Sequence, residues 1–396
     1  MIKVSKKHTL LIKIILAIII GILIGLYCPN GIVVLFTEVS NFLQKLISFF
    51  VPLIVLGFVV SGISSLRNSS GKLLAIALFL SYGFMFAGAI AAYLISKNVF
   101  PMFLETQNID FSSFGFKEHP HFNVNIPPIM DVMTAIVLSF IIGIGISKIK
   151  GNTLKNLFDE FHDIVELTVK KAMIPIIPFY IVGIFAKMSS KGKVFEVLFN
   201  FSKFIGVMIC THILILIAQY IVAAIITKKN VFRLLKNVIP AYITSLATQS
   251  SVAAIPVSIK SARNNGVSEK ISNFIIPLCS TIHLTGSAIS ITANVVAVMM
   301  MSNMEISFLN ILYFILLLGI VMVAAPGVPC GAIFAVFPIL QNSFGFDQNM
   351  LGLVIAIHIA QDGFGTACNV VGDGAIALIT EKINSKYFEK SEKVRS

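Results

Sequence analysis

The fold of this chain is decided by a helix-breaking run in its last third, which reads Ala325-Pro326-Gly327-Val328-Pro329-Cys330-Gly331. The run lies at the centre of residues 306–346, which contain no charged side chain. Such a segment is long enough to cross a bilayer twice, because one crossing takes about 20 apolar residues. Two prolines and two glycines break a helix, however, and backbone groups freed inside a membrane must line a protein-buried cavity. A hairpin that enters the membrane and returns to the same side therefore fits better than two spans.

The composition of the whole chain is that of a polytopic membrane protein. Of its 396 residues, 57% are hydrophobic and only 12% are charged, whereas soluble proteins carry about 25% charged residues. These values exclude a disordered protein and a soluble enzyme of ordinary composition. The predicted spans cover residues 9–27, 40–64, 73–97, 131–148, 165–188 and 199–226.

A second hairpin is predicted over residues 232–262. Apolar flanks there surround the polar run Thr248-Gln249-Ser250-Ser251, and Pro256 follows. The chain then continues with a helix over 272–302, the hairpin 308–345 and a helix over 351–381. Two successive hairpin–helix units predict an inverted repeat, and broken helices that meet at the bilayer midplane are where transporters bind substrate and ions.

The charge pattern indicates membrane topology. The net charge is +12, but the basic residues lie at the ends of apolar segments, as the positive-inside rule requires, so we expect no nucleic-acid partner. Both termini are predicted to be cytoplasmic, with residues 98–130 as an external loop. The exception is a short loop with Lys187, Lys191 and Lys193, which this topology places outside.

The last helix carries a polar stripe. His358, Asp362, Thr366, Asn369 and Asp373 are four, four, three and four residues apart, which puts them on one helix face. A charge in the membrane costs about 2.5–3.5 kcal/mol on insertion scales, and residues 271–380 contain no Lys or Arg. The simplest partner is a bound cation, namely a substrate ammonium, Na⁺ or a proton. A lysine from another helix, or a buried protonated aspartate with a structural role, is the alternative.

The helix 272–302 contains the polar cluster Ser280-Thr281-Ile282-His283-Leu284-Thr285-Gly286-Ser287. This cluster either unwinds and exposes carbonyl groups, which are ligands for hard cations, or packs closely through its small residues. His283 and His358 are candidate proton carriers, or hydrogen-bonded core residues. Ser251, His283 and Asp362 are also the residue types of a hydrolase, but Ser251 has no nucleophile-elbow context. An intramembrane hydrolase is thus a remote alternative.

At these residues the chain resembles the dicarboxylate/amino acid:cation symporter family, the glutamate transporter homologues, over roughly residues 9–382. The serine-rich tip and proline of the family's first hairpin correspond to residues 249–256 of this chain. Its Asn-Met-Asp-Gly-Thr motif is met by residues 283–287, and its Gly-Val-Pro-Gly tip by residues 327–330. Its eighth-helix pattern, Asp-x-x-Arg-Thr-x-x-Asn-x-x-x-Asp, is met by residues 362–373.

The resemblance implies an all-α polytopic fold of eight transmembrane helices and two re-entrant helical hairpins with inverted repeats. It further implies a homotrimer in the cell membrane, in which a transport domain moves against a scaffold as an elevator. The implied divisions are 1–71 (scaffold helices 1 and 2), 72–97 (transport-domain helix 3), 98–130 (external loop), 131–193 (scaffold helices 4 and 5), 194–382 (the rest of the transport domain) and 383–396 (cytoplasmic tail).

The resemblance also implies a site for the backbone of an amino acid. Asp362 would bind the substrate ammonium, and Asn369 with the Ser251 region would bind the α-carboxylate. The other implied substrate contacts are Thr366, Ser287 and Gly365, with Gly327 and Val328 in an external gate over 326–329. Asp373 would coordinate one cation, such as Na⁺, helped by carbonyl groups near Cys279, His283 and Asn369.

Several residues depart from the family pattern. The eighth-helix arginine that binds an acidic side chain is Gly365, the seventh-helix aspartate is Thr285, and helix 3 has Met85 and Phe86 where relatives have hydroxyl groups. The resemblance implies a symporter with no enzymatic activity or cofactor, and these changes predict that it imports a neutral amino acid with H⁺ and/or Na⁺. The alternatives are an acidic amino acid or a C4-dicarboxylate as substrate, with a histidine in place of the arginine, or a channel.

Overall fold

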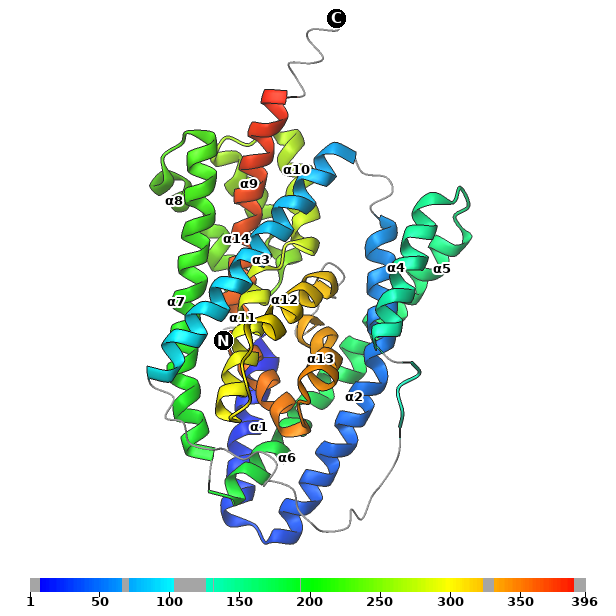
Figure 1. The fold of residues 1–396 in the computed structure, drawn as a ribbon, viewed down its shortest axis with the longest axis vertical. Helices are drawn as coiled ribbons and strands as arrows, with labels where there is room; N and C mark the ends of the chain where they lie inside the picture. Colours follow the sequence, from blue (N-terminus) through cyan, green and yellow to red (C-terminus); the bar gives the residue numbers. More distant parts are fainter. Residues whose placement is uncertain are drawn as a thin grey trace, which may run out of the picture.

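The computed structural model describes residues 8–65, 71–102, 126–130, 132–192, 194–322 and 331–387. Every regular element in these ranges is helical (Figure 1), as the composition predicts. The elements of the first half are α1 (His8–Tyr27), α2 (Asn30–Ser65), α3 (Gly71–Val99), η2 (Phe100–Met102), α4 (Val132–Lys148), α5 (Thr153–Thr168), the π-helical turn η4 (Val169–Met173), α6 (Ile174–Ser190) and α7 (Val194–Thr227). Those of the second half are α8 (Val231–Thr248), α9 (Ser251–Asn264), α10 (Glu269–Ile282), α11 (Thr285–Met301), α12 (Phe308–Met322), α13 (Gly331–Phe344) and α14 (Gln348–Tyr387).

Within the described ranges, six helical stretches are long and apolar enough to cross a membrane: Asn30–Ser61, Leu73–Met102, Thr153–Ser190, Ser202–Thr227, Glu269–Met301 and Asn349–Ser385. Three shorter apolar helices are Ile12–Tyr27, Val137–Lys148 and Phe308–Met322. Large apolar side chains remain exposed on α1, α4 and α7, where lipid tails are the matching solvent. The chain is a multi-pass membrane protein.

One set of helices consists of α1, α2, α4, α5 and α6. In this set α6 packs against α1 and α2, and α2 also packs against α4 and α5. Glycine allows close approach of the helices: a Cβ added at Gly21 would lie 2.6 Å from the Val182 carbonyl oxygen. The Ser40 hydroxyl donates to the Tyr180 carbonyl oxygen at 2.7 Å and ties α2 to α6. Small residues and hydroxyl groups thus hold this set together, as is usual for membrane helices.

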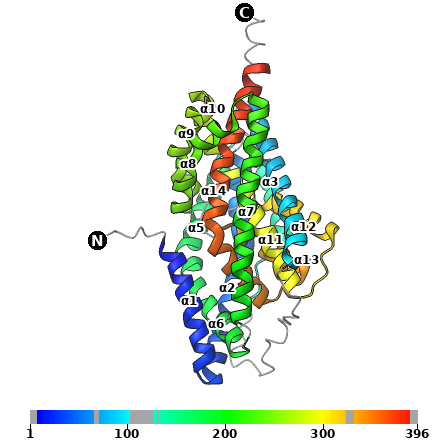
Figure 2. The same cartoon turned by 90° about the vertical axis from the view of Figure 1, so that its left-hand side faces the viewer.

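The second set surrounds α14. This helix packs against α3, α7, α8, α9, α10 and α11, and it runs alongside α7 in Figure 2. Its residues from Leu351 to Thr380 are buried almost without exception, so its polar stripe faces protein and not lipid. The helix pair α8 and α9 lies towards the C-terminal end of α14, whereas α12 and α13 lie towards its N-terminal end (Figure 1).

Helix breaks occur where polar residues interrupt the apolar pattern. Between α8 and α9, Gln249 has a left-handed backbone with φ 47°, and the Ser250 side chain caps α9 by accepting a hydrogen bond from the Ala253 amide at 3.3 Å. Between α10 and α11, the break falls at His283 and Leu284. The predicted helix over 272–302 is therefore two helices, and the polar cluster does unwind.

Two predictions about the first half need correction. The span predicted over 165–188 belongs to a continuous helical run, Thr153–Ser190, because the π-helical turn η4 joins α5 to α6 without a break. Lys187 is not in a loop: it lies in the last turn of α6, where its residue is only 8% exposed. The predicted tip motif 327–330 and the gate 326–329 fall outside the described residues.

Candidate functional site

The centre of the candidate site is the imidazole of His283, at the break between α10 and α11. Its Nδ1 lies 2.9 Å from the Asp373 Oδ1 atom and 3.2 Å from the Asn369 carbonyl oxygen, both on α14. Its Nε2 lies 2.7 Å from the Thr285 hydroxyl oxygen. The side chains of His283 and Asp373 are 0% and 1% exposed. An imidazole therefore lies against the oxygen atoms that the sequence predicted as cation ligands.

The local backbone explains why His283 reaches this position. Its amide donates to the Cys279 carbonyl oxygen at 2.8 Å, which closes the last turn of α10. Its own backbone is extended, with φ −101° and ψ 94°, so the ring turns away from the helix axis. On α14, Gly372 leaves room for the ring, because a Cβ at this position would collide with the His283 Cε1 atom. Unwinding and a glycine together let the ring reach α14.

The Asn369 side chain is the cap of α11. Its Oδ1 accepts hydrogen bonds from the amides of Gly286 at 2.7 Å and Ser287 at 3.4 Å, and its Nδ2 donates to the Ser287 hydroxyl at 3.0 Å. Amides in the first turn of a helix have no partner within the helix, and here they are buried. Asn369 thus fixes the start of α11 against α14, one turn of α14 from Asp373.

The helices α11 and α14 approach each other closely at Gly286 and Gly365. A Cβ added at Gly286 would lie 2.8 Å from the Cys368 Cβ atom and would overlap the Gly365 carbonyl oxygen. A Cβ added at Gly365 would instead lie 3.3 Å from the Ser290 hydroxyl oxygen, which is a tight but tolerable contact. The small residues of the polar cluster therefore serve close packing as well as unwinding.

Asp362 lies about three turns from Asp373 along α14, near the break between α8 and α9. Its side chain is 14% exposed, and its Oδ1 is 3.7 Å from the His358 Nε2 atom, too far for a hydrogen bond. The next residue, Gly363, faces α8: a Cβ there would lie 3.5 Å from the Gln249 Nε2 atom. Ser251 begins α9 just beyond that junction and is partly buried. A carboxyl group and a serine-rich helix start thus lie in the same region.

The comparison with known proteins identifies the family. A family model described as the sodium:dicarboxylate symporter family matches residues 10–383. The chain belongs to this family. The neutral amino acid transporter A of Bos taurus is 27% identical over 269 residues, which are 66% of this chain and 50% of that protein. The excitatory amino acid transporter 1 of Ambystoma tigrinum is 27% identical over 66% of this chain and 49% of its own length. This symporter-family chain spans about half the length of these curated relatives.

Two buried polar residues of this family member, His212 and Gln361, were not predicted from the sequence as functional candidates. His212 of α7 is 2% exposed, and its Nε2 lies 3.0 Å from both the Gly286 carbonyl oxygen and the Ser290 hydroxyl oxygen. The Gln361 amide nitrogen donates to Asn294 Oδ1 at 2.6 Å, which joins α14 to α11. Ionisable side chains within apolar helices are functional candidates by default. This rule could have identified His212 from the sequence. Gln361 lies one residue off the stripe and was missed for that reason.

The predicted residues fall into three places in this symporter-family fold. The buried cluster around the α10–α11 break holds His283, Cys279, Ser287, Asn369 and Asp373, and the adjoining turns of α14 hold His358, Asp362, Gly365 and Thr366. Ser251 lies at the α8–α9 break, and Gly327 and Val328 lie outside the described residues. Both ring nitrogens of His283 contact groups other than Asp362, so Ser251, His283 and Asp362 do not form a hydrolytic triad.

Proposed function

We propose that this protein is a cation-coupled symporter that imports an amino acid with a neutral side chain. The observation that carries the proposal is Asp362, a partly exposed carboxyl group that lies beside the α8–α9 break with no basic residue in 271–380 to neutralise it. A substrate ammonium is the matching partner. Gly365 offers no guanidinium group, and a buried substrate carboxylate would lack a bidentate partner. The names of the relatives, which include neutral and excitatory amino acid transporters, support an amino acid as substrate.

We propose further that the two helix sets are a scaffold and a transport domain. The helices α1, α2, α4, α5 and α6 contact one another much more than they contact α14, which favours two bodies that slide past each other. In this proposal the pairs α8–α9 and α12–α13 are re-entrant hairpins, which brings the number of membrane spans to eight. From the family resemblance and the charge pattern, the proposal also includes a homotrimer in the cell membrane with both termini in the cytoplasm.

The coupling ion in this proposal is a proton. The His283 Nδ1 atom lies within hydrogen-bonding reach of the Asp373 carboxylate and the Asn369 carbonyl oxygen. A bound Na⁺ would need the oxygen atoms of Asp373 and Asn369 as ligands, so the His283 imidazole would have to move away from them. The other titratable groups near this pair are Tyr220 of α7, Cys279 of α10 and Cys368 of α14. None of these groups supplies a positive charge, so His283 is the natural carrier of a proton beside Asp373.

The test is uptake into liposomes that contain the purified protein. A mixture of the common amino acids, succinate and fumarate is offered under an inward H⁺ gradient, with and without Na⁺, and the accumulated solutes are identified by mass spectrometry. We expect neutral amino acids to accumulate above equilibrium without Na⁺. Glutamate, aspartate or a dicarboxylate accumulating instead would contradict the substrate assignment. Uptake that never exceeds equilibrium would mean a channel.

The coupling ion is tested with a pair of histidine variants. His283→Asn should abolish uptake driven by the H⁺ gradient, and it should allow Na⁺ to drive uptake if the vacated oxygen atoms then bind it. His358→Asn removes the buried histidine of the polar stripe on α14 and is the control, because His358 does not contact Asp373. Loss of H⁺ coupling in the His358 variant alone would refute the assignment to His283.

A further inference from the structure

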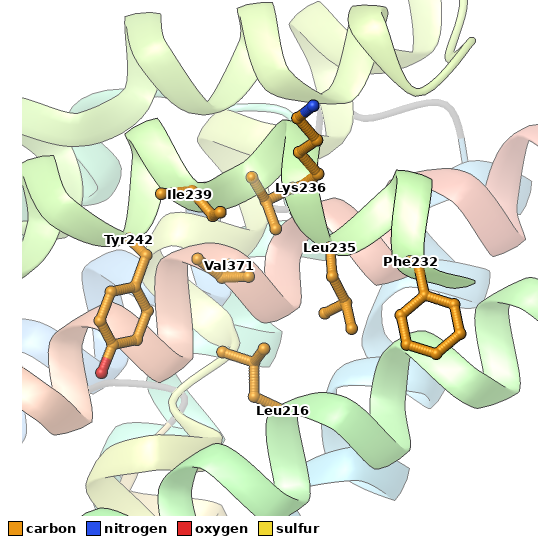
Figure 3. Close-up of a pocket in the computed structure, with 8 residues that line it drawn as sticks. Leu216, Phe232, Leu235, Lys236, Ile239, Tyr242 and Val371 are labelled. Carbon is orange, nitrogen blue, oxygen red and sulfur yellow. The ribbon is translucent and has the colours of Figure 1, made fainter. Parts of the chain in front are cut away.

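An apolar groove of about 320 Å³ lies between α7, α8 and α14. Its wall is formed by Leu216 of α7, by Leu235, Ile239 and Tyr242 of α8, and by Val371 of α14 (Figure 3). Lys236 lies at the edge, and its ammonium group points away from the apolar side chains. The groove is thus apolar along its length, with one lysine on its rim.

The depth of the groove matches one leaflet of a bilayer. The apolar stretch of α7 ends at Thr227, and Lys228 and Lys229 follow at the bilayer surface. Leu216 precedes Thr227 by about three helical turns, or about 16 Å at 1.5 Å per residue. The hydrocarbon core is about 30 Å thick, so the groove extends from the surface to about the middle of the membrane. One acyl chain of a lipid spans the same distance.

The surface end of α8, next to the groove, carries several basic residues. Residues 228–268 contain no Asp or Glu, and Lys228, Arg233 and Lys236 are exposed. The Lys229 ammonium has a partner, because it donates to the Asn265 carbonyl oxygen at 2.5 Å. Basic residues at the bilayer surface attract anionic headgroups. Charge and shape therefore favour the same kind of ligand.

We propose that this groove binds an anionic phospholipid, with one acyl chain along Leu216, Ile239 and Val371 and the phosphate against Lys236 and Arg233. Because α5 also carries acidic residues beside exposed apolar side chains, a second copy of this chain is the competing occupant that the crosslinking experiment must exclude. The proposal does not depend on the transported substrate, since it uses only the membrane location of α7.

The test compares lipids that differ only in headgroup. Thermal unfolding of the purified protein in detergent is measured with phosphatidylglycerol, with phosphatidylcholine of the same acyl chains, and with inorganic phosphate. We expect phosphatidylglycerol alone to raise the unfolding midpoint, by about 3 °C at a concentration 100-fold above its Kd. The double variant Lys236→Gln, Arg233→Gln should lose this rise, whereas the control Lys260→Gln, an exposed lysine of α9 outside the groove, should keep it.

Three results of these unfolding measurements would contradict the proposed lipid site. Equal stabilisation by the two lipids, or an unchanged response in the double variant, would overturn the proposal. Stabilisation by inorganic phosphate alone would remove any role for the apolar groove. Unfolding midpoints measured in phosphatidylcholine show whether each variant is folded.

Photo-crosslinking identifies the occupant directly. Ile239, which is 52% exposed, is replaced with p-benzoylphenylalanine, and the protein is irradiated in membranes that contain phosphatidylglycerol. An adduct with the mass of that lipid supports the proposal. A crosslink to a second copy of the chain, or no lipid adduct at all, would refute it.

Discussion

The contact between α11 and α14 gives the sharpest test of the site geometry, through the substitution Gly286→Ala. The new Cβ would lie 2.8 Å from the Cys368 Cβ atom and would overlap the Gly365 carbonyl oxygen. Carbon atoms in contact lie about 3.5–4.0 Å apart, so the helices must separate by about 1 Å. The 2.7 Å hydrogen bond from the Gly286 amide to Asn369 would then stretch beyond the usual limit of about 3.2 Å.

The expected cost combines two effects. Overpacking costs about 1–3 kcal/mol, and a buried amide left without an acceptor costs about 1–3 kcal/mol more. Gly365→Ala is the matched control, because its Cβ would lie 3.3 Å from the Ser290 hydroxyl oxygen and 3.4 Å from the Gly286 carbonyl oxygen, with no overlap. Thermal unfolding in detergent should therefore give a midpoint several degrees lower for Gly286→Ala than for Gly365→Ala. Equal midpoints would refute the close approach of the two helices at Gly286.

Three further predictions address the substrate and the cap. Gly365→Arg should shift uptake towards acidic substrates, measured by competition between glutamate and neutral amino acids in liposomes, and no shift would place the side-chain pocket elsewhere. Asp362→Asn should abolish uptake of amino acids because it removes the partner of the substrate ammonium, but it should spare any dicarboxylate uptake. Asn369→Ala should lower the unfolding midpoint, because the amides of Gly286 and Ser287 lose their acceptor at a cost of about 1–3 kcal/mol each. An unchanged midpoint would mean that Asn369 does not cap α11.

Local patterns in the sequence predicted the helix breaks but not the contacts made across them. The polar run Thr248–Ser251 correctly indicated a break, because a left-handed residue and a serine cap are local features. The four-residue spacing along α14 likewise predicted a buried polar face. The bond between His283 and Asp373 was not predicted, because it depends on how far α10 and α11 rotate when the helix unwinds. The use of the Asn369 side chain as a cap was missed for the same reason, since its partners lie on another helix.

Two departures from the family motifs together leave the net charge of the motif positions unchanged. The motif aspartate is replaced by Thr285 and the motif arginine by Gly365, so the site loses one negative and one positive charge together. In our proposal the remaining carboxyl groups, Asp362 and Asp373, are each matched by one positive charge, from the substrate ammonium and from protonated His283. An arginine restored alone at position 365 would lack part of its compensation, and an unpaired buried charge costs about 3–5 kcal/mol.

The double variant Gly365→Arg, Thr285→Asp should consequently transport glutamate faster than Gly365→Arg alone, and it should also unfold at a higher temperature. Thr285 precedes Gly286, which packs on Gly365, so the two positions are neighbours across α11 and α14, although the Thr285 side chain itself faces His283 and Gly88 of α3. Thr285→Asp alone is the control and should slow uptake of neutral amino acids, because it adds an unmatched carboxylate beside His283. If the second substitution brings no gain in rate or stability over the arginine alone, the charges at the two positions are independent and the argument from balance is wrong.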